Sequence, residues 1–404
     1  MLRLLRATSL LVRGDPRTSG SLMQGTIFPW RGGNRFELLI DGQSFFPHML
    51  AAIDGAERQV ELELYLIEDG QCSWRLAEAL CRASARGVSV RCLFDAYGGA
   101  GLGSSLRQQL QQAQVQVRWY NPLRWRRGIR NFHRDHRKLL LVDERLAYVG
   151  GTGSTDEFWL PDEPQSPWHE TMVAIEGPLV SDWQRLFEFQ WRARFSWRPN
   201  HPAVPQRLPE RPRIGSGLGR VAYADAAQHR DILLALLRAL RGARRRVWLA
   251  TPYFLPTWKI RRALRQAASR GVEVRLLLAG RNTDHPPVRF AGQRYYPKLL
   301  RAGVRIFEYQ PRFLHLKMVL VDDWVSVGSC NFDHWNLHFN LDANVEVLDP
   351  SFSQEVAASF SEDFARSREI TLEDWRQRPL WRRLQQRLWG WLERLAVNLL
   401  KHRR

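Results

Sequence analysis

Two short stretches of the chain repeat a set of residue types that could do phosphoryl chemistry. Each has a histidine, a lysine two residues later and an aspartate five residues after the lysine, with an apolar run before the aspartate. One such set could arise by chance, but two at matching positions predict a single shared site. The residues are His136, Lys138 and Asp143 in the first stretch and His315, Lys317 and Asp322 in the second.

Lysine and histidine together suit a displacement at phosphorus. An ammonium group neutralises the non-bridging oxygens as charge shifts, and one imidazole can attack the phosphorus. A second, protonated imidazole can give a proton to the departing alcohol. In-line displacement needs the two imidazoles on opposite sides of one phosphorus, which two copies related by a pseudo-two-fold axis would provide.

A metal centre is the alternative interpretation, because His133, His136, His169 and Glu170 are all potential ligands. A charged lysine has no lone pair to give a metal, yet lysine recurs at the same place in both stretches. We therefore expect no metal and no cofactor, and we interpret His133 alone as a structural residue.

The apolar run 139–142 predicts a strand next to the first histidine. Side chains alternate along extended backbone, so His136 and Lys138 should project to the same side. Asp143 should lie where this strand turns into the next one, at 147–149.

The two stretches belong to a longer internal repeat. The spacing between equivalent residues shortens slowly, from 188 residues for Tyr65 and Tyr253 to 179 for His136 and His315. A kept order with a slowly drifting spacing indicates a duplicated α/β unit. The expected strands are 37–40, 60–67, 88–94, 247–250 and 272–278, and the expected helices are 45–56, 73–85, 226–242 and 260–269.

Proline and glycine divide the chain into segments. Five prolines followed by three glycines between 199 and 219 have the composition of a linker. The predicted organisation is a basic N-terminal segment at 1–33, a first domain at 34–198, the linker at 199–219, a second domain at 220–369 and a basic amphipathic tail at 370–404.

Within the tail, apolar residues recur at three- and four-residue spacing, which predicts one amphipathic helix. Its apolar face could pack on the domain, or the helix could lie in a membrane interface, as its tryptophans and basic end also allow. The apolar residues are Leu380, Leu384, Leu388, Trp391, Leu395 and Leu399.

The composition indicates a polyanionic partner. The formal net charge is +19, which suits either nucleic acid or the headgroups of a membrane surface. A spanning helix is not expected, because we find no uninterrupted apolar run of about 18 residues.

With these features in view, the paired motifs resemble the HKD motifs of the phospholipase D superfamily. The resemblance extends from about residue 34 to 369 and is closest to bacterial cardiolipin synthases of the short type without transmembrane helices. Supporting stretches include 251–254 and 328–333. It implies two similar α/β/α sandwich domains related by a pseudo-two-fold axis, with the active site at their interface.

The resemblance also implies residue roles in a metal-independent exchange through a covalent phosphohistidine. His136 would be the nucleophile, and His315 the general acid that later becomes the base. The other roles implied are phosphoryl-oxygen binding by Lys138 and Lys317, orientation or tuning of the histidines by Asp143 and Asp322, and substrate binding by Ser329, Asn331, Gly151 and Gly153. Gly153 departs from the family pattern, because asparagine is expected there as at Asn331.

The function implied is that of a cardiolipin synthase, which turns two phosphatidylglycerols into cardiolipin and glycerol. The expected partners are phosphatidylglycerol and a membrane surface, with neither nucleic acid nor a protein partner. The expected location is peripheral, on the cytoplasmic face of the inner membrane. Alternatives with the same site are a hydrolytic phospholipase D and a phosphodiesterase or nuclease. A catalytically silent membrane-binding protein is the alternative from another class, which two intact motifs do not favour.

Overall fold

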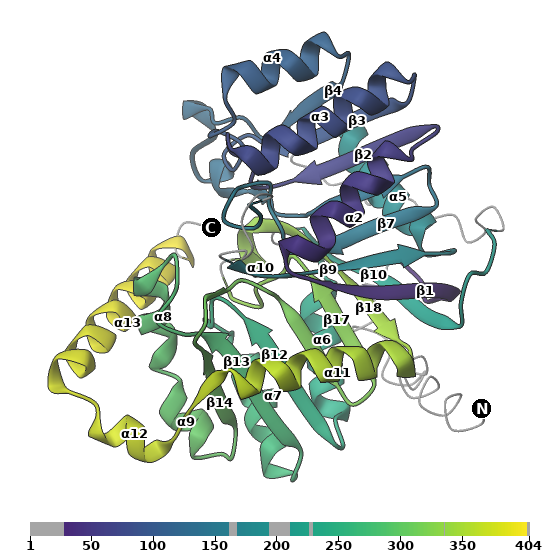
Figure 1. Cartoon of the computed structure of the whole chain (residues 1–404). Helices are drawn as coiled ribbons and strands as arrows, with labels where there is room; N and C mark the ends of the chain where they lie inside the picture. Colours follow the sequence, from purple (N-terminus) through teal and green to yellow (C-terminus); the bar gives the residue numbers. More distant parts are fainter. Residues whose placement is uncertain (1–27, 161–167, 194–210, 226–228, 335, 402–404) are drawn as a thin grey trace.

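The computed structural model describes residues 28–160, 168–193, 211–225, 229–334 and 336–401 (Figure 1). Its first half is built on a mixed sheet with the order β4-β3-β2-β6-β7-β9-β1. Three neighbouring strands are parallel and the rest antiparallel. Their bounds are β1 Arg31–Ile40, β2 Gln59–Leu64, β3 Ser89–Asp95, β4 Gln116–Tyr120, β6 Leu139–Val142, β7 Leu146–Gly150 and β9 Thr171–Glu176.

The second half repeats this sheet in the order β14-β13-β12-β16-β17-β18-β10, with β19 added at one edge. The matching order confirms the duplicated α/β unit. The edge strands β1 and β10 also pair with each other, which joins the two sheets. The bounds are β10 Gly217–Asp225, β12 Arg246–Thr251, β13 Glu273–Ala279, β14 Arg305–Tyr309, β16 Met318–Val321, β17 Trp324–Gly328, β18 Asn340–Leu348 and β19 Ser367–Ile370.

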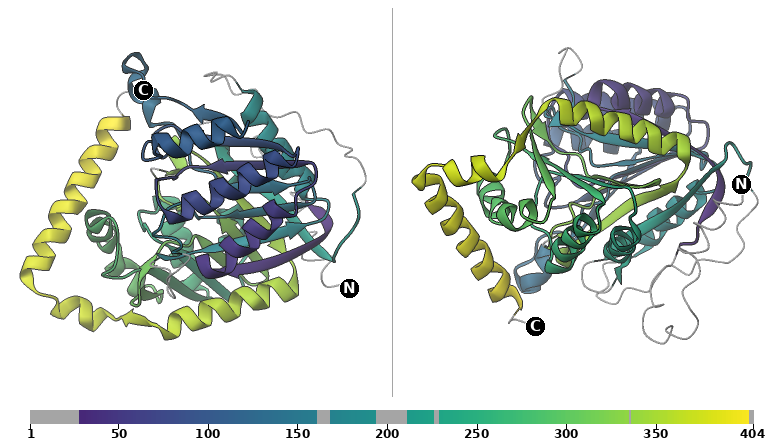
Figure 2. Two further views of the ribbon diagram at one scale, coloured as in Figure 1. Left: turned by 45° about the horizontal axis from the view of Figure 1, so that its top comes forward. Right: turned by 90° about the horizontal axis from the view of Figure 1, so that it is seen from below.

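Helices cover both sheets and fill the space between them (Figures 1 and 2). One apolar cluster joins α2, α3 and α4 to the outer face of the first sheet, and a second joins α6 and α7 to the outer face of the second sheet. The third cluster combines α5, α11 and both sheets, so these two helices form the shared layer between the halves. The bounds are α2 Gly42–Asp54, α3 Gln71–Ala85, α4 Ser104–Gln112, α5 Val180–Arg192, α6 Asp231–Gly242, α7 Trp258–Ser269 and α11 Pro350–Ala365.

The repeat extends to individual contacts. Arg86 Nη2 donates hydrogen bonds to the carbonyls of Ile53 and Ala56, at 3.0 and 3.3 Å. Arg270 Nη2 does the same for the end of α6, where the carbonyl of Leu240 lies 3.0 Å away. Each arginine satisfies carbonyls left free at a helix C-terminus, so these two arginines have the same structural role in the two halves.

Some predicted boundaries differ from the structure. β1 begins at Arg31, inside the predicted N-terminal segment, and β10 begins at Gly217, inside the predicted linker. The helix expected at 226–242 begins only at Asp231, because the short strand β11, His229–Arg230, first pairs with β10. Most of the N-terminal segment and much of the linker lie outside the described residues. The remaining domain limits stay predictions.

The predicted tail helix is confirmed as α13, Leu380–Lys401, and a short helix α12, Leu372–Gln377, precedes it. Pro379 separates the two, because proline disfavours the helical conformation for the residue before it. Arg378 is accordingly extended, with φ −62° and ψ 143°. Among the described helices, none combines the length and apolarity needed to cross a bilayer.

Candidate active site

The first motif is held by a strand of the opposite half. The short strand β5, Arg134–Asp135, pairs in parallel with the beginning of β18 in the second half. The backbone N–H of His136 continues this pairing by donating to the carbonyl of Leu341 at 2.9 Å. The first histidine therefore lies at the boundary between the halves.

The second motif is held in the reciprocal way. The short strand β15, Phe313–Leu314, pairs in parallel with β8, Trp168–His169, from the first half. The backbone N–H of His315 donates to the carbonyl of His169 at 2.8 Å. Each motif is therefore hydrogen-bonded through its backbone to the other half of the molecule, which brings both motifs to one interface.

Each histidine ring is oriented by a carboxylate from the opposite half. His136 Nδ1 lies 2.9 Å from Asp342 Oδ1, and His315 Nδ1 lies 2.6 Å from Glu170 Oε2. A neutral imidazole that donates its Nδ1–H to a carboxylate keeps a lone pair on Nε2. Both rings are therefore arranged with Nε2 as the base or nucleophile.

The lysines lie beside their own histidines. In the first half, the ring of Tyr65 contacts both side chains, with its centroid 4.9 Å from that of His136 and 5.2 Å from Lys138 Nζ. In the second half, Lys317 Nζ donates to Glu170 Oε2 at 3.1 Å and lies 3.2 Å from His315 Nε2. The expectation that histidine and lysine project to the same side holds in both copies.

The two motifs share one electrostatic environment. Burial lowers the pKa of His136 to about 4, and Lys138 and Lys317 add to the effect. Burial likewise lowers the pKa of His315 to about 3, with contributions from Lys317 and Lys138. Each imidazole therefore senses the ammonium of the other half, and both are neutral at neutral pH in the free protein.

The charges around the rings also respond to burial. Burial and the charge of Lys317 together lower the pKa of Lys138 to about 7. Although burial by itself would raise the pKa of Glu170, Lys317 and His315 hold it at about 2. The carboxylates are thus ionised, but they do not fully balance the positive charge of the two neighbouring lysines. Such a site favours binding of an anion such as a phosphodiester.

Asp143 and Asp322 do not contact the histidines, so the expected orienting role is wrong. The carboxylate of Asp143 accepts hydrogen bonds from the backbone N–H groups of 57–59, at 2.8 to 2.9 Å. Asp322 accepts from the N–H groups of 244–246 in the same manner, at 2.8 to 3.0 Å. Both lie beyond a strand of four residues, at its end opposite the histidine, where they close the loop that leads into β2 or β12.

The predicted substrate-binding residues fall into two groups. Ser329 donates to Asp342 Oδ1 at 2.7 Å, and Asn331 Oδ1 is buried without a hydrogen-bond partner among the described residues. Gly151 and Gly153 have no side chain that could bind substrate, and neighbouring atoms occupy the space where a Cβ would lie. A Cβ at Gly151 would come within 2.2 Å of the Glu170 carboxylate, and one at Gly153 within 2.9 Å of the carbonyl oxygen of Leu66.

These contacts explain why the first copy departs from the family pattern. The longer Glu170 reaches His315 by lying over a glycine, whereas the shorter Asp342 is supported by a serine at the equivalent position. Position 153 has no space for an asparagine side chain without a shift of the backbone at Leu66. Substrate binding by the four residues remains a prediction.

The residues considered as metal ligands separate in the structure. His169 lies between two carboxylates, with Nδ1 2.8 Å from Asp41 Oδ1 and Nε2 3.0 Å from Asp363 Oδ1. Glu170 is committed to His315, and His136 to Asp342. Within the part of the chain that the structure describes, no three His, Cys, Asp or Glu side chains converge as a metal site.

Sequence reasoning missed the orienting roles of Glu170 and Asp342. A signal was present, because Glu170 directly precedes the apolar strand β9 and Asp342 lies within β18. Both are buried, which is rare for a carboxylate without a partner. Pairing each with the histidine of the opposite half required the tertiary structure.

Comparison with known proteins places this architecture in a family. The family described as "Cardiolipin synthase, PLD-like domain" matches residues 49–191 and 236–364, which contain the two motifs. The chain belongs to this family. Its phospholipase D-like repeat accounts for the duplicated sheets and for the crossed pairing of histidines and carboxylates.

Members of the cardiolipin synthase family are similar to this chain over most of its length. Cardiolipin synthase A of Pseudomonas putida is 37% identical over 350 residues, which cover 86% of this chain and 71% of that protein. Cardiolipin synthase B of Salmonella typhi is 35% identical over 336 residues, covering 80% and 79%.

Solved structures share the fold. Phosphatidylserine synthase of Haemophilus influenzae superposes with a TM-score of 0.68 at 14% identity, covering 90% of this chain and 94% of that one. Polyphosphate kinase of Porphyromonas gingivalis gives 0.57 at 16% identity, covering 83% and 48%. At this identity the likenesses concern the fold alone.

Proposed function

We propose that the protein is a cardiolipin synthase that transfers a phosphatidyl group between two phosphatidylglycerol molecules. The observation that carries the proposal is the crossed pair of histidines, each oriented by a carboxylate from the other half and each beside its own lysine. Family membership and the similarity to named cardiolipin synthases support this choice of substrate.

In the first step, Nε2 of one histidine, assigned by family resemblance to His136, attacks the phosphorus of phosphatidylglycerol. A P–N bond forms, the P–O bond to the headgroup glycerol breaks, and the leaving alkoxide takes a proton from His315. The free protein holds both imidazoles neutral. The negative charge of the bound phosphodiester favours the protonated form of the second imidazole.

In the second step, His315 accepts the proton of a hydroxyl on a second phosphatidylglycerol. That oxygen attacks the phosphorus, the P–N bond breaks, and cardiolipin is released with the histidine restored. Lys138 and Lys317 neutralise the phosphoryl oxygens in both steps, and Asn331 is a further donor to them. Asp342 and Glu170 hold the rings and stabilise an imidazolium when it forms.

The protein acts at a membrane surface, and we place it peripherally on the cytoplasmic face of the inner membrane. A lipid acceptor must compete with water at the phosphohistidine. A site held against the bilayer favours transfer over hydrolysis because lipid hydroxyls are concentrated there and water is partly excluded.

The test incubates purified protein with phosphatidylglycerol vesicles, with and without phosphatidylethanolamine, and resolves the lipids by mass spectrometry. Cardiolipin and free glycerol are expected in equal amounts. Phosphatidic acid as the only lipid product would instead establish a hydrolytic phospholipase D. A parallel incubation with DNA tests the nuclease alternative. Cleavage of the DNA without lipid turnover would establish a nuclease.

A further inference from the structure

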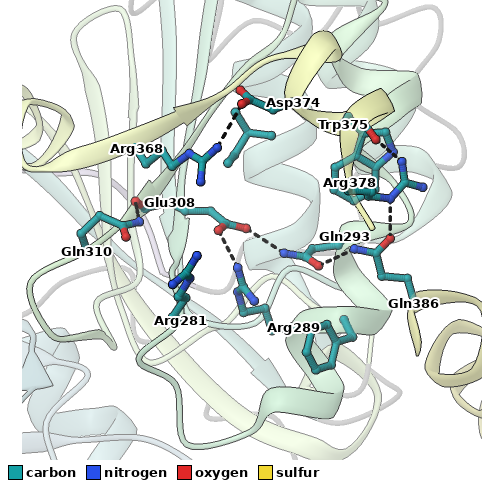
Figure 3. Close-up of a pocket in the computed structure, with 12 residues that line it drawn as sticks. Arg281, Arg289, Gln293, Glu308, Gln310, Arg368, Asp374, Trp375, Arg378 and Gln386 are labelled. Atoms are coloured by element: carbon teal, nitrogen blue, oxygen red, sulfur yellow. Dashed lines mark hydrogen bonds and ion pairs between the residues drawn. The ribbon is translucent and has the colours of Figure 1, made fainter. Parts of the chain in front are cut away.

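The tail helix α13 is packed with its polar side toward the protein. Gln386 is buried and donates from Nε2 to Gln293 Oε1 at 2.9 Å, and it accepts from Arg378 Nε at 3.0 Å (Figure 3). On the same side, Arg294 donates to the carbonyl of Gly390. These contacts attach α13 to α8, Pro286–Gln293. Gln293 and Gln386 also line a cavity of about 100 Å³ between the two helices and their neighbours.

The apolar side of α13 consequently faces away from the protein. Its large residues recur at helical spacing and form one stripe opposite Gln386. A contiguous apolar stripe left open in this way marks a surface for another partner. The exposed fractions are 77% for Leu380, 71% for Leu384, 51% for Leu388 and 54% for Trp391.

A second element presents the same combination of residues beside the active site. The segment that contains η1, Trp125–Phe132, exposes Leu123, Phe132 and Trp125, the last at 99%. Its base is fixed, because Asn121 Nδ2 donates to the carbonyls of Arg130 and His133 at 2.9 and 2.8 Å. The apolar tip is therefore a shaped part of the fold.

These two elements lie on the same side of the molecule. In all three ribbon views the C-terminal end of α13 lies near the segment that follows β4 and carries η1 (Figures 1 and 2). That segment leads directly into β5 and His136. The rings of Phe132 and His133 also pack against the ring of Phe339, with centroid distances of 6.3 and 6.1 Å. Phe339 directly precedes the strand that carries Asp342.

Charge decides what covers this surface. Arginines accompany the apolar residues on both elements, and the side chains of Arg124, Arg126 and Arg387 have no hydrogen-bond or ion-pair partner within the described residues. Exposed tryptophan and leucine next to arginines without a protein counter-ion suit the headgroup region of an anionic bilayer, where the arginines can bind lipid phosphates.

We propose that α13 and the η1 segment together form a docking surface for an anionic lipid bilayer. This inference rests on the proposed function, because it supplies the way in which the site reaches its lipid. Trp125 and the stripe of α13 enter the interface, the arginines bind lipid phosphates, and the first motif is thereby held next to the bilayer.

The test measures binding of the full-length protein to vesicles of phosphatidylcholine with or without phosphatidylglycerol, by co-sedimentation. Leu384→Gln with Leu388→Gln, and Leu123→Ser with Trp125→Ser, should each weaken binding to the anionic vesicles roughly tenfold or more. Arg124→Glu with Arg126→Glu should have a similar effect that disappears at high salt.

Matched control variants lie elsewhere on the surface. Ile214→Ser removes an exposed apolar residue before β10, and Arg238→Glu with Arg241→Glu reverses two exposed charges on α6. Both controls should bind as the unchanged protein does. Turnover of a water-soluble short-chain phosphatidylglycerol should be preserved in all variants, because none of these residues belongs to the catalytic site.

The inference is overturned if the stripe and η1 variants bind anionic vesicles as tightly as the controls. It is also overturned if the stripe variant turns a dimer into a monomer in light scattering with vesicle binding unchanged, since a second copy would then cover the stripe. Failure of the proposed function is a separate result, because phosphatidic acid as sole product leaves the vesicle binding measurements standing.

Discussion

His136 of the first half and Asp342 of the second half are joined by a contact of 2.9 Å between Nδ1 and Oδ1. The reciprocal contact joins His315 to Glu170 at 2.6 Å. Neither half can therefore orient its own histidine, and the active arrangement exists only when the two halves are docked together.

The crossed carboxylates give the first prediction. Asp342→Asn and Glu170→Gln should each lower kcat by roughly 10²–10⁴-fold, because the amide no longer fixes the tautomer or stabilises an imidazolium. The folded structure should persist, as circular dichroism would show. Wild-type kcat in either variant would exclude the orienting role.

Asp143 and Asp322 provide a matched control with the same chemical change. Asp143→Asn and Asp322→Asn should destabilise the fold by about 1–3 kcal/mol, because each carboxylate accepts three backbone N–H groups. The kcat of the folded fraction should stay near the wild-type value. A large loss of kcat without a lower melting temperature would restore the role that the family resemblance assigned to them.

Gly151 and Ser329 are expected to respond unequally to exchange. Gly151→Ser should lower kcat at least about 100-fold, because its Cβ would displace the Glu170 carboxylate and with it His315. Ser329→Gly removes the hydrogen bond donated to Asp342 and the one accepted from the N–H of Ala343, and should cost about 1–2 kcal/mol, or roughly a 5- to 30-fold loss. Equal effects of the two changes in steady-state assays would contradict this account of the asymmetry.

His169 predicts a pH dependence of stability. Burial alone would lower its pKa, but Asp363 and Asp41 raise it to about 9. Because the folded pKa exceeds the ordinary value of 6.5, the stabilisation is fully present below about pH 6.5 and is lost as the pH rises through 9.

The check compares thermal unfolding of the wild type with His169→Gln between pH 6 and 10. The wild type should be more stable by a few kcal/mol at pH 6, and the difference should shrink toward pH 10. A difference that stays constant across this range would show that His169 is uncharged in the folded protein.

Much of the fold followed from local patterns. The alternating and apolar runs predicted β2, β3, β12 and β13, and the repeated motif predicted that two histidines serve one site. The orienting carboxylates could not be found in this way, because Glu170 reaches His315 only through the pairing of β8 with β15. Which face of α13 packs on the protein could not be predicted either, since the apolar periodicity of a helix does not say whether its apolar face is covered.

The most direct test of the central claim counts phosphohistidines. Protein mixed with phosphatidylglycerol is quenched within one turnover, and peptides that contain His136 and His315 are analysed by mass spectrometry. If both histidines serve one phosphorus, at most one phosphatidyl group is bound per chain, on a single histidine, and His136→Ala or His315→Ala each abolishes turnover. Adducts on both histidines of one chain, or half of the activity surviving in either variant, would show two independent sites and contradict the account.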